Sequence, residues 1–132
     1  MNSNVPVCRN PGKKGEDQAA AWLENAGMEI ISRNFRSRFG EIDIIAREEE
    51  TIVFLEVKTW SFYGLEDLQH SINTGKQRRI IKTAKFFLSE NRKYSRMAIR
   101  FDVIFIKDAK TPAGFNGFPI THLASAFTEQ ML

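Results

Sequence analysis

The sequence is poor in cysteine and contains no long apolar run. Cys8 is the single cysteine among 132 residues, which excludes an internal disulfide and a cysteine-based zinc knuckle. No stretch approaches the ~18 consecutive apolar residues of a membrane span. The first residues also lack the apolar core of a signal peptide. We therefore expect a cytoplasmic protein with no membrane partner.

Histidine is scarce as well, and one part of the chain is nearly free of acids. His70 and His122 are isolated, and neither has metal-ligand spacing with another His or Cys, so we interpret both as structural. Between Lys76 and Arg100, nine Lys or Arg residues accompany a single acid, Glu90, although the net charge of the chain is only +3. This clustering of basic residues indicates a surface for an anionic partner.

Apolar periodicity predicts a single α/β domain with its elements in the order α-β-β-β-α-β. Residues 1–12 show no periodicity and are predicted to form a disordered arm ahead of one domain at residues 13–132. Helices are predicted over residues 13–26 and 74–89, and strands over residues 28–35, 41–47, 51–58 and 97–106. Residues 59–73 are predicted to be loop, and residues 119–127 a short edge strand with a last helical turn.

Charged residues interrupt the two central strands of this prediction. Residues two apart in a strand share a face, so Glu56 and Lys58 lie together at the C-terminal end of theirs. The rest of that strand is apolar on both faces, which is typical of a strand covered by helices on both sides. The charged pair therefore falls where a covered sheet opens into a crevice. On the preceding strand, Glu41 and Asp43 are expected to share one face with Ile45.

Asp43 and Glu56 are expected to lie near one another if these two strands pair. Two carboxylates about 5 Å apart repel by roughly 3 kcal/mol at an effective dielectric constant near 20. A proton, a nearby lysine or a divalent cation must offset that repulsion. Two carboxylates and a backbone carbonyl suit Mg²⁺, which also binds substrate phosphate. Lys58 could then orient or deprotonate an attacking water, an arrangement typical of phosphodiester cleavage.

A structural ion pair is the alternative explanation, because Glu-x-Lys is common on exposed strands. Three features favour catalysis: the apolar flanking faces, the second acid one strand earlier and the basic helix that follows. Glu16 is a further candidate, since it shares a face of the first helix with Ala20 and Leu23 and is expected to point inward.

Four stretches form an ordered series of motifs: "GE" at 15–16, "RNFRSRFGEIDIIA" at 33–46, "VFLEVKT" at 53–59 and "RFDVI" at 100–104. In this order they resemble the YraN-type family of uncharacterised bacterial proteins. That family looks like a compact member of the restriction-endonuclease-like, PD-(D/E)XK superfamily, related in layout to archaeal Holliday-junction resolvases. The resemblance implies an α/β fold with a central mixed sheet flanked by helices.

The resemblance also implies a metal-dependent endonuclease that cuts DNA with Mg²⁺ or Mn²⁺, on branched or structured substrates. Asp43 and Glu56 would be metal ligands, Lys58 the catalytic lysine, and Glu16 an additional acid that binds the metal or orients the site. Resolvase-like enzymes are commonly homodimers, because two symmetric cuts require two sites.

One departure is Trp60, where the family usually has Arg. Loss of that Arg would weaken a phosphate contact, or Trp60 would stack on a splayed base. The structural alternative is that Trp60 packs beside Phe62 and Tyr63.

The second predicted helix offers a surface for the phosphate backbone. Arg78, Lys82 and Lys85 repeat at i, i+4 and i+7, with Lys76 and Arg79 nearby. This pattern predicts contacts to DNA phosphates, with recognition by shape rather than by base edges. A solvated helix face is the alternative.

Asp102 is the other acid on a predicted core strand. It is expected to have a structural role, pairing with Arg100 or with a base on the second helix. The alternative is that Asp102 supports the residues of the active site without itself contacting the metal or the substrate.

Two further functions remain open. The protein could be a non-catalytic nucleic-acid-binding adaptor in repair, recombination or DNA uptake, working with a protein partner. It could also be a protein–protein module in which the charged strand residues form only ion pairs.

Overall fold

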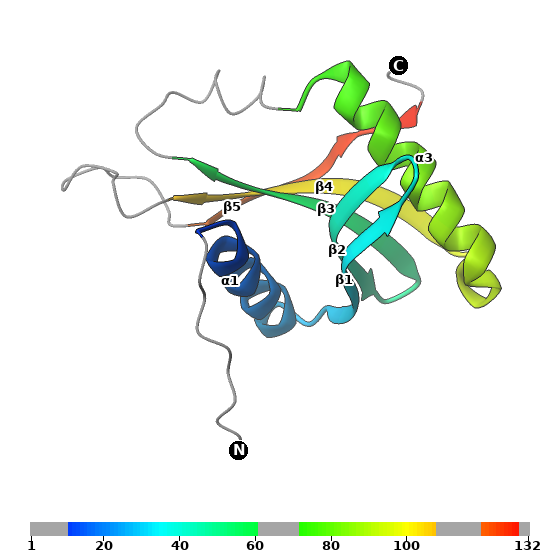
Figure 1. Cartoon of the computed structure of the whole chain (residues 1–132). Coiled ribbons are helices and arrows are strands. Elements are labelled where there is room, and N and C mark those ends of the chain that lie inside the picture. Colours follow the sequence, from blue (N-terminus) through cyan, green and yellow to red (C-terminus); the bar gives the residue numbers. More distant parts are fainter. Residues whose placement is uncertain (1–10, 61–71, 108–119, 130–132) are drawn as a thin grey trace.

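The chain folds as one mixed sheet with two long helices (Figure 1). The computed structural model describes residues 11–60, 72–107 and 120–129. The elements are α1 (Pro11–Asn25), β1 (Glu29–Ser37), β2 (Gly40–Glu48), β3 (Thr51–Trp60), α3 (Thr74–Glu90), the 3₁₀ helix η1 (Arg92–Tyr94), β4 (Ala98–Lys107) and β5 (Ile120–Phe127). None of the helices in these ranges has the length and apolar character needed to cross a membrane.

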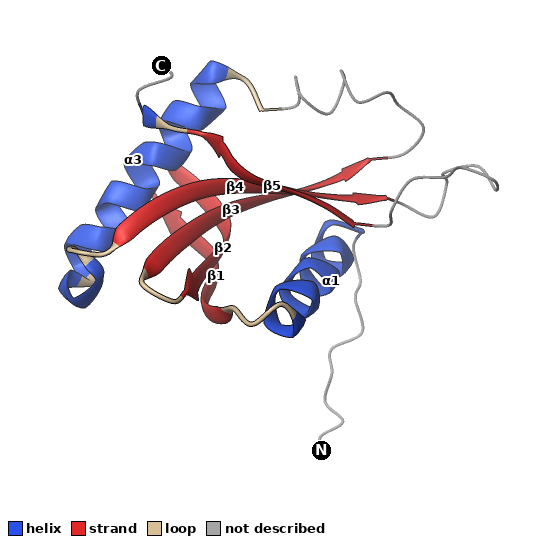
Figure 2. Ribbon diagram, turned by 180° about the vertical axis from the view of Figure 1, so that it is seen from behind, coloured by secondary structure: helices blue, strands red, loops and turns tan. Residues whose placement is uncertain are grey.

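The five strands lie in the order β1-β2-β3-β4-β5 (Figure 2). β3 and β4 are parallel, and the other neighbours are antiparallel. Parallel neighbours need a crossover connection, and α3 belongs to the segment that joins β3 to β4. The predicted α/β fold with a central mixed sheet flanked by helices is therefore confirmed.

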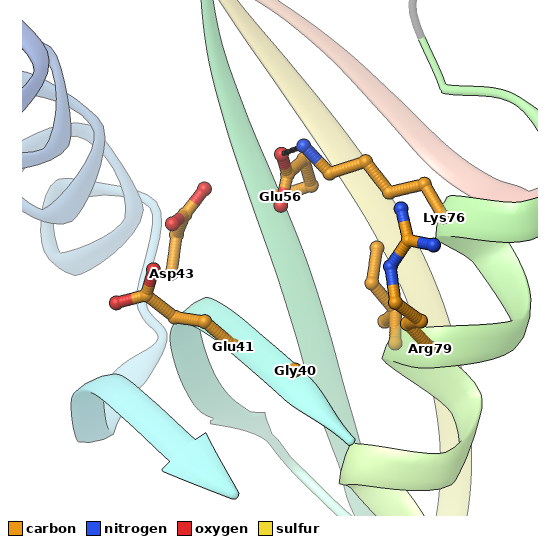
Figure 3. A pocket seen from close by; sticks show the side chains of 7 residues that line it. Gly40, Glu41, Asp43, Glu56, Lys76 and Arg79 are labelled. Carbon is orange, nitrogen blue, oxygen red and sulfur yellow. Dashed lines mark ion pairs between the residues drawn. The ribbon is translucent and has the colours of Figure 1, made fainter. Parts of the chain in front are cut away.

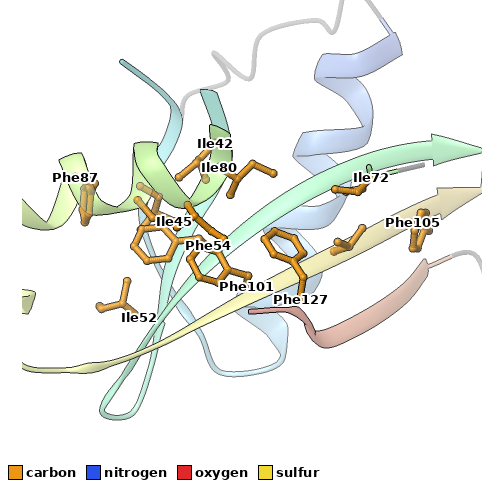
Figure 4. Packing of buried hydrophobic residues seen from close by; sticks show 13 residues of the cluster. Ile42, Ile45, Ile52, Phe54, Ile72, Ile80, Phe87, Phe101, Phe105 and Phe127 are labelled. Carbon is orange, nitrogen blue, oxygen red and sulfur yellow. The ribbon is translucent and has the colours of Figure 1, made fainter. Parts of the chain in front are cut away.

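The two long helices cover opposite faces of the sheet. α1 buries Ala19, Ala20 and Leu23 against Ile44, Ala46, Val53, Leu55, Ile104 and Ile106. α3 buries Ile80, Ile81, Ala84 and Phe87 against Ile45, Ile52, Phe54, Phe101, Phe105 and Phe127, as Figure 4 shows in part. β3 is thus apolar on both faces, as its sequence predicts.

The end of the chain differs from its prediction. Residues 120–127 form strand throughout, and the predicted last helical turn within them is wrong. Pairing with β4 continues past a bulge at Ser125, which has a left-handed backbone with φ of 51°. The Ser125 amide donates a hydrogen bond to the Asp102 carboxylate at 2.9 Å, so a buried side chain supplies the acceptor that the disrupted ladder lacks.

The N-terminal arm predicted at residues 1–12 lies almost entirely outside the described residues, and α1 begins at Pro11. His70 also lies outside them.

Asp102 is the centre of a buried polar network on β4. Its fully buried carboxylate accepts from Arg100 Nε at 2.9 Å and lies 2.6 Å from His122 Nε2, and Arg100 Nη1 reaches Glu48 at 3.0 Å. Burial alone would raise the pKa of Asp102, but the hydrogen bonds from His122, Arg100 and Ser125 hold it below its ordinary value. The predicted pairing with Arg100 is confirmed, and His122 has the structural place expected of it.

Removing this acceptor should destabilise the protein while leaving the carboxylates of Asp43 and Glu56 in place. We expect Asp102→Ala to lower the free energy of unfolding by about 3 kcal/mol at neutral pH, because buried donors lose their partner. Urea denaturation measures the change. Glu48→Gln, which alters only the half-exposed partner of Arg100, should change stability by less than about 1 kcal/mol. Equal losses in the two variants would contradict this account.

Candidate active site

The sheet divides between β2 and β3. Their pairing runs from Glu48–Thr51 to Ile44–Leu55. Beyond that point the Asp43 carboxylate accepts a hydrogen bond from the Val57 amide at 2.8 Å. A side chain has therefore replaced the backbone as the acceptor for β3, and the two strands can separate there.

The expected alternation along β2 breaks at the same residue. Ile42 and Ile45 both pack on the α3 side of the sheet, whereas Ile44 packs on the α1 side. The expectation that Glu41 and Asp43 share a face with Ile45 assumes unbroken alternation along β2, and this alternation is not present. The physical reason is that β2 leaves the β3 ladder at Asp43 while its pairing with β1 continues as far as Gly40.

Three carboxylates come together where the strands separate. Asp43 comes from β2, Glu56 from β3 and Glu16 from α1. Burial raises the pKa of Asp43 to about 7, helped by the charges of Glu56 and Glu16 and opposed by the Val57 hydrogen bond. Glu56 itself is buried, with 6% of its surface exposed. The structure thus brings together the three acids that the sequence predicts for the site.

Glu16 reaches this cluster because α1 crosses the end of β3 closely. A Cβ atom at Gly15 would lie 2.9 Å from Thr59 Oγ1, so a side chain there would require Thr59 or the helix to shift. Arg33 on β1 contacts two acids of α1, with Nη2 2.6 Å from Asp17 and 3.7 Å from Glu16. Sequence reasoning missed Arg33, and its place in the "RNF" motif was the only signal for it.

Two lysines share the Glu56 carboxylate. Lys76 Nζ lies 2.5 Å from Glu56 Oε2, and Lys58 Nζ lies 3.6 Å from the same oxygen. Burial lowers the pKa of Lys58, and the adjacent Lys76 lowers it further. Burial alone would also lower the pKa of Lys76, but its contact with Glu56 outweighs burial and raises it. Lys58 is therefore the more readily deprotonated of the two amines.

A cavity of about 150 Å³ joins these groups to the N-terminal part of α3 (Figure 3). The hairpin between β1 and β2 forms one wall. Gly40, with φ of 154°, allows the hairpin to approach α3, since a Cβ there would contact Arg79 and Thr83 at 3.4 Å. Ser37 Oγ donates to Thr83 Oγ1 at 3.3 Å. The lining residues are Gly40, Glu41, Asp43, Glu56, Lys76, Arg79 and Ile80.

The structure divides the predicted DNA-contacting residues into two groups. Lys76 and Arg79 line the cavity. Arg78 and Lys82 are exposed on α3, and exposed Lys85 forms an ion pair with Glu129 at 2.5 Å. The helix therefore presents Lys76 and Arg79 to the cavity and Arg78 and Lys82 to solvent, while Lys85 is paired with Glu129.

The donor set of the cavity fits a hard divalent cation. Asp43 and Glu56 offer carboxylate oxygens, the ligands that Mg²⁺ and Mn²⁺ prefer, and burial and the neighbouring acids oppose the ionisation of Asp43 unless positive charge is added. Among the residues that the structure describes, no group of three or more Asp, Glu, His or Cys side chains is placed so that it could hold a metal ion together. A cation held here would have two protein carboxylates, and water or phosphate oxygens would complete its shell.

The chain is thus an α/β protein whose acids and lysines gather where its sheet divides. The profile of the uncharacterised protein family UPF0102 matches residues 15–106, and the chain belongs to this family. A UPF0102 protein of Treponema denticola is 48% identical over 88% of this chain and 93% of its own length. One from Persephonella marina is 50% identical over 72% and 81%, and one from Rhodococcus opacus is 44% identical over 88% and 94%. The predicted resemblance is thus confirmed at the level of a bacterial family.

The raised pKa of Asp43 has a consequence for stability. The folded protein holds this proton up to about pH 7, whereas the ordinary value is 3.8. The contribution of Asp43 to stability is therefore fully present below about pH 4 and is lost as the pH rises through about 7. In metal-free buffer, Asp43→Asn should unfold with a free energy higher than wild type by on the order of 2 kcal/mol at pH 8.

Urea denaturation of both proteins between pH 4 and pH 8 measures this difference, which should shrink toward the acidic end. Glu41→Gln is the matched control, because Glu41 lines the same cavity but is partly exposed and paired with Arg36. An Asp43→Asn variant that is less stable than wild type at every pH would contradict the prediction.

Proposed function

We propose that this protein is a Mg²⁺- or Mn²⁺-dependent endonuclease that hydrolyses phosphodiester bonds in DNA. The observation that carries the proposal is the convergence of Asp43, Glu56 and Glu16 with Lys58 at the division of the sheet. Such a set combines ligands for a hard cation with an amine able to move a proton. The resemblance to the restriction-endonuclease-like, PD-(D/E)XK superfamily supports the same assignment.

Each group then has a distinct role. The cation, when held by Asp43 and Glu56, would neutralise phosphate charge and lower the pKa of the attacking water. Lys58, whose pKa is lowered by burial and by Lys76, orients that water and accepts its proton. Glu16, positioned by Arg33, adds a third negative charge beside the ligands.

The exposed basic row on α3 positions the DNA. Arg78, Lys82 and Lys85 would contact phosphates, while Arg79 faces the cavity from the same helix. Phosphate contacts fix position without reading sequence, so the substrate would be selected by shape. The resolvase resemblance favours branched or structured DNA and a homodimer with one site in each subunit.

Cleavage of a labelled DNA panel tests the proposal: linear duplex, single strand, flap and four-way junction, each with Mg²⁺, Mn²⁺ or EDTA. We expect metal-dependent cutting, a preferred shape, and losses of about 100-fold or more in Asp43→Asn and Lys58→Ala, because each removes a group used in the chemical step. Glu90→Gln, an exposed acid at the end of α3, should cut like wild type. Purifying all variants identically separates this activity from a contaminating nuclease, whose cutting would be equal in all of them.

A non-catalytic adaptor is the second candidate. It is favoured by the ion pair between Lys76 and Glu56, because a lysine there already neutralises an acid without metal. An adaptor would bind DNA with steep salt dependence through α3, cut nothing, and respond to neither the Asp43 nor the Lys58 substitution. That combination would replace the nuclease proposal with the adaptor.

A further inference from the structure

Lys76 differs from the other basic residues of α3 in what it contacts. Its amine lies 2.5 Å from Glu56 Oε2, closer than Lys58 at 3.6 Å, and Figure 3 shows the side chain extending from α3 across the cavity to that carboxylate. Glu56 is one of the two acids expected to hold the cation. Lys76 therefore stands at an oxygen that the cation would need.

The start of α3 fixes the base of this side chain. Asn73 caps the helix by accepting from the Lys76 amide at 2.9 Å, and its carbonyl accepts from the Gln77 amide at 3.0 Å. Gln77 Nε2 also donates to the Ile72 carbonyl at 3.2 Å. The backbone of Lys76 is thus anchored, while its side chain is 30% exposed and has a flexible four-carbon stem.

We propose that Lys76 is a tethered cation that exchanges partners during the reaction cycle. In the free protein the Lys76 amine pairs with the Glu56 carboxylate. When that carboxylate holds a divalent cation instead, the Lys76 amine moves to a phosphate oxygen of the bound DNA. This inference rests on the proposed function, and it assigns Lys76 a positioning role that the exposed row of Arg78, Lys82 and Lys85 does not have.

Charge and distance together account for the exchange. An ammonium group and a divalent cation on one carboxylate would repel each other strongly in a half-buried cavity. The DNA phosphate brings new negative charge to the same mouth, within reach of a side chain anchored at the helix start. Lys76 would then lower the affinity for metal in the free protein and raise the affinity for DNA in the metal-loaded protein.

The test measures two quantities that should move in opposite directions. Mn²⁺ binding to the DNA-free protein is followed by calorimetry, and single-turnover cleavage of the best substrate is followed at saturating Mn²⁺. We expect Lys76→Met to bind Mn²⁺ roughly tenfold more tightly and to cut at least roughly tenfold more slowly, a split that simple damage to the fold cannot produce.

Two further variants complete the design. Arg47→Met removes one positive charge from the end of β2 far from Asp43, where Arg47 pairs with Glu50, and should leave both quantities unchanged. Lys76→Arg keeps the charge and should stay near the wild-type Mn²⁺ affinity. If Lys76→Met does not fold, Lys76→Arg still tests whether the charge sets the Mn²⁺ affinity. Thermal unfolding with and without Mn²⁺ shows whether each variant is folded.

The results separate this inference from the proposed function. The role of Lys76 alone would be overturned by the following outcome: wild type binds Mn²⁺, Asp43→Asn does not, and Lys76→Met binds it with unchanged or weaker affinity. Wild type that neither binds Mn²⁺ nor cuts DNA would overturn both the nuclease and the exchange.

Discussion

The hydrogen bond from the Val57 amide to the Asp43 carboxylate is the contact on which the site depends. It satisfies a backbone donor that the β2–β3 ladder would otherwise pair, so the two strands can separate without leaving a buried amide unpartnered. β2 continues along β1 to Gly40, and β3 continues along β4 to Trp60. Pairing with β1 and with β4 thus positions the two strands on either side of the cavity after their own ladder has ended.

Two aspartates of this sheet show how environment decides the role of one residue type. Asp102 accepts from Arg100, His122 and Ser125, and these hydrogen bonds lower its pKa despite complete burial. Asp43 accepts from one amide and faces two other carboxylates, and its pKa rises to about 7. The first carboxylate is neutralised by the fold itself. The second is buried beside other carboxylates, and a proton or an added cation would offset their repulsion. A carboxylate with its pKa raised in this way is expected of a functional group.

Local patterns predict most of the fold because the apolar residues of each helix and strand recur with the period of that element. The apolar faces of β3 and the stripe of α3 place both helices, and the motifs place Asp43, Glu56 and Lys58 near one another. The partner of Lys76 is a different matter. The sequence presents it as one of several bases on a helix, and its contact with Glu56 depends on how far α3 sits from β3. The strand form of residues 120–127 also depends on a distant contact, because Asp102 supports the bulge at Ser125.

α3 connects stability to the site more directly than any other element. Ile80 and Ala84 bury its apolar face against the sheet, while Lys76 and Arg79, on the adjoining face, line the cavity. Ser37 and Thr83 join the helix to the β1–β2 hairpin, so the wall that carries Glu41 and the wall that carries Lys76 are held together. A change of charge at Glu56 therefore acts first on a flexible lysine side chain and not on the packed helix. The fold can accept a cation at this point by moving one side chain while its core remains in place.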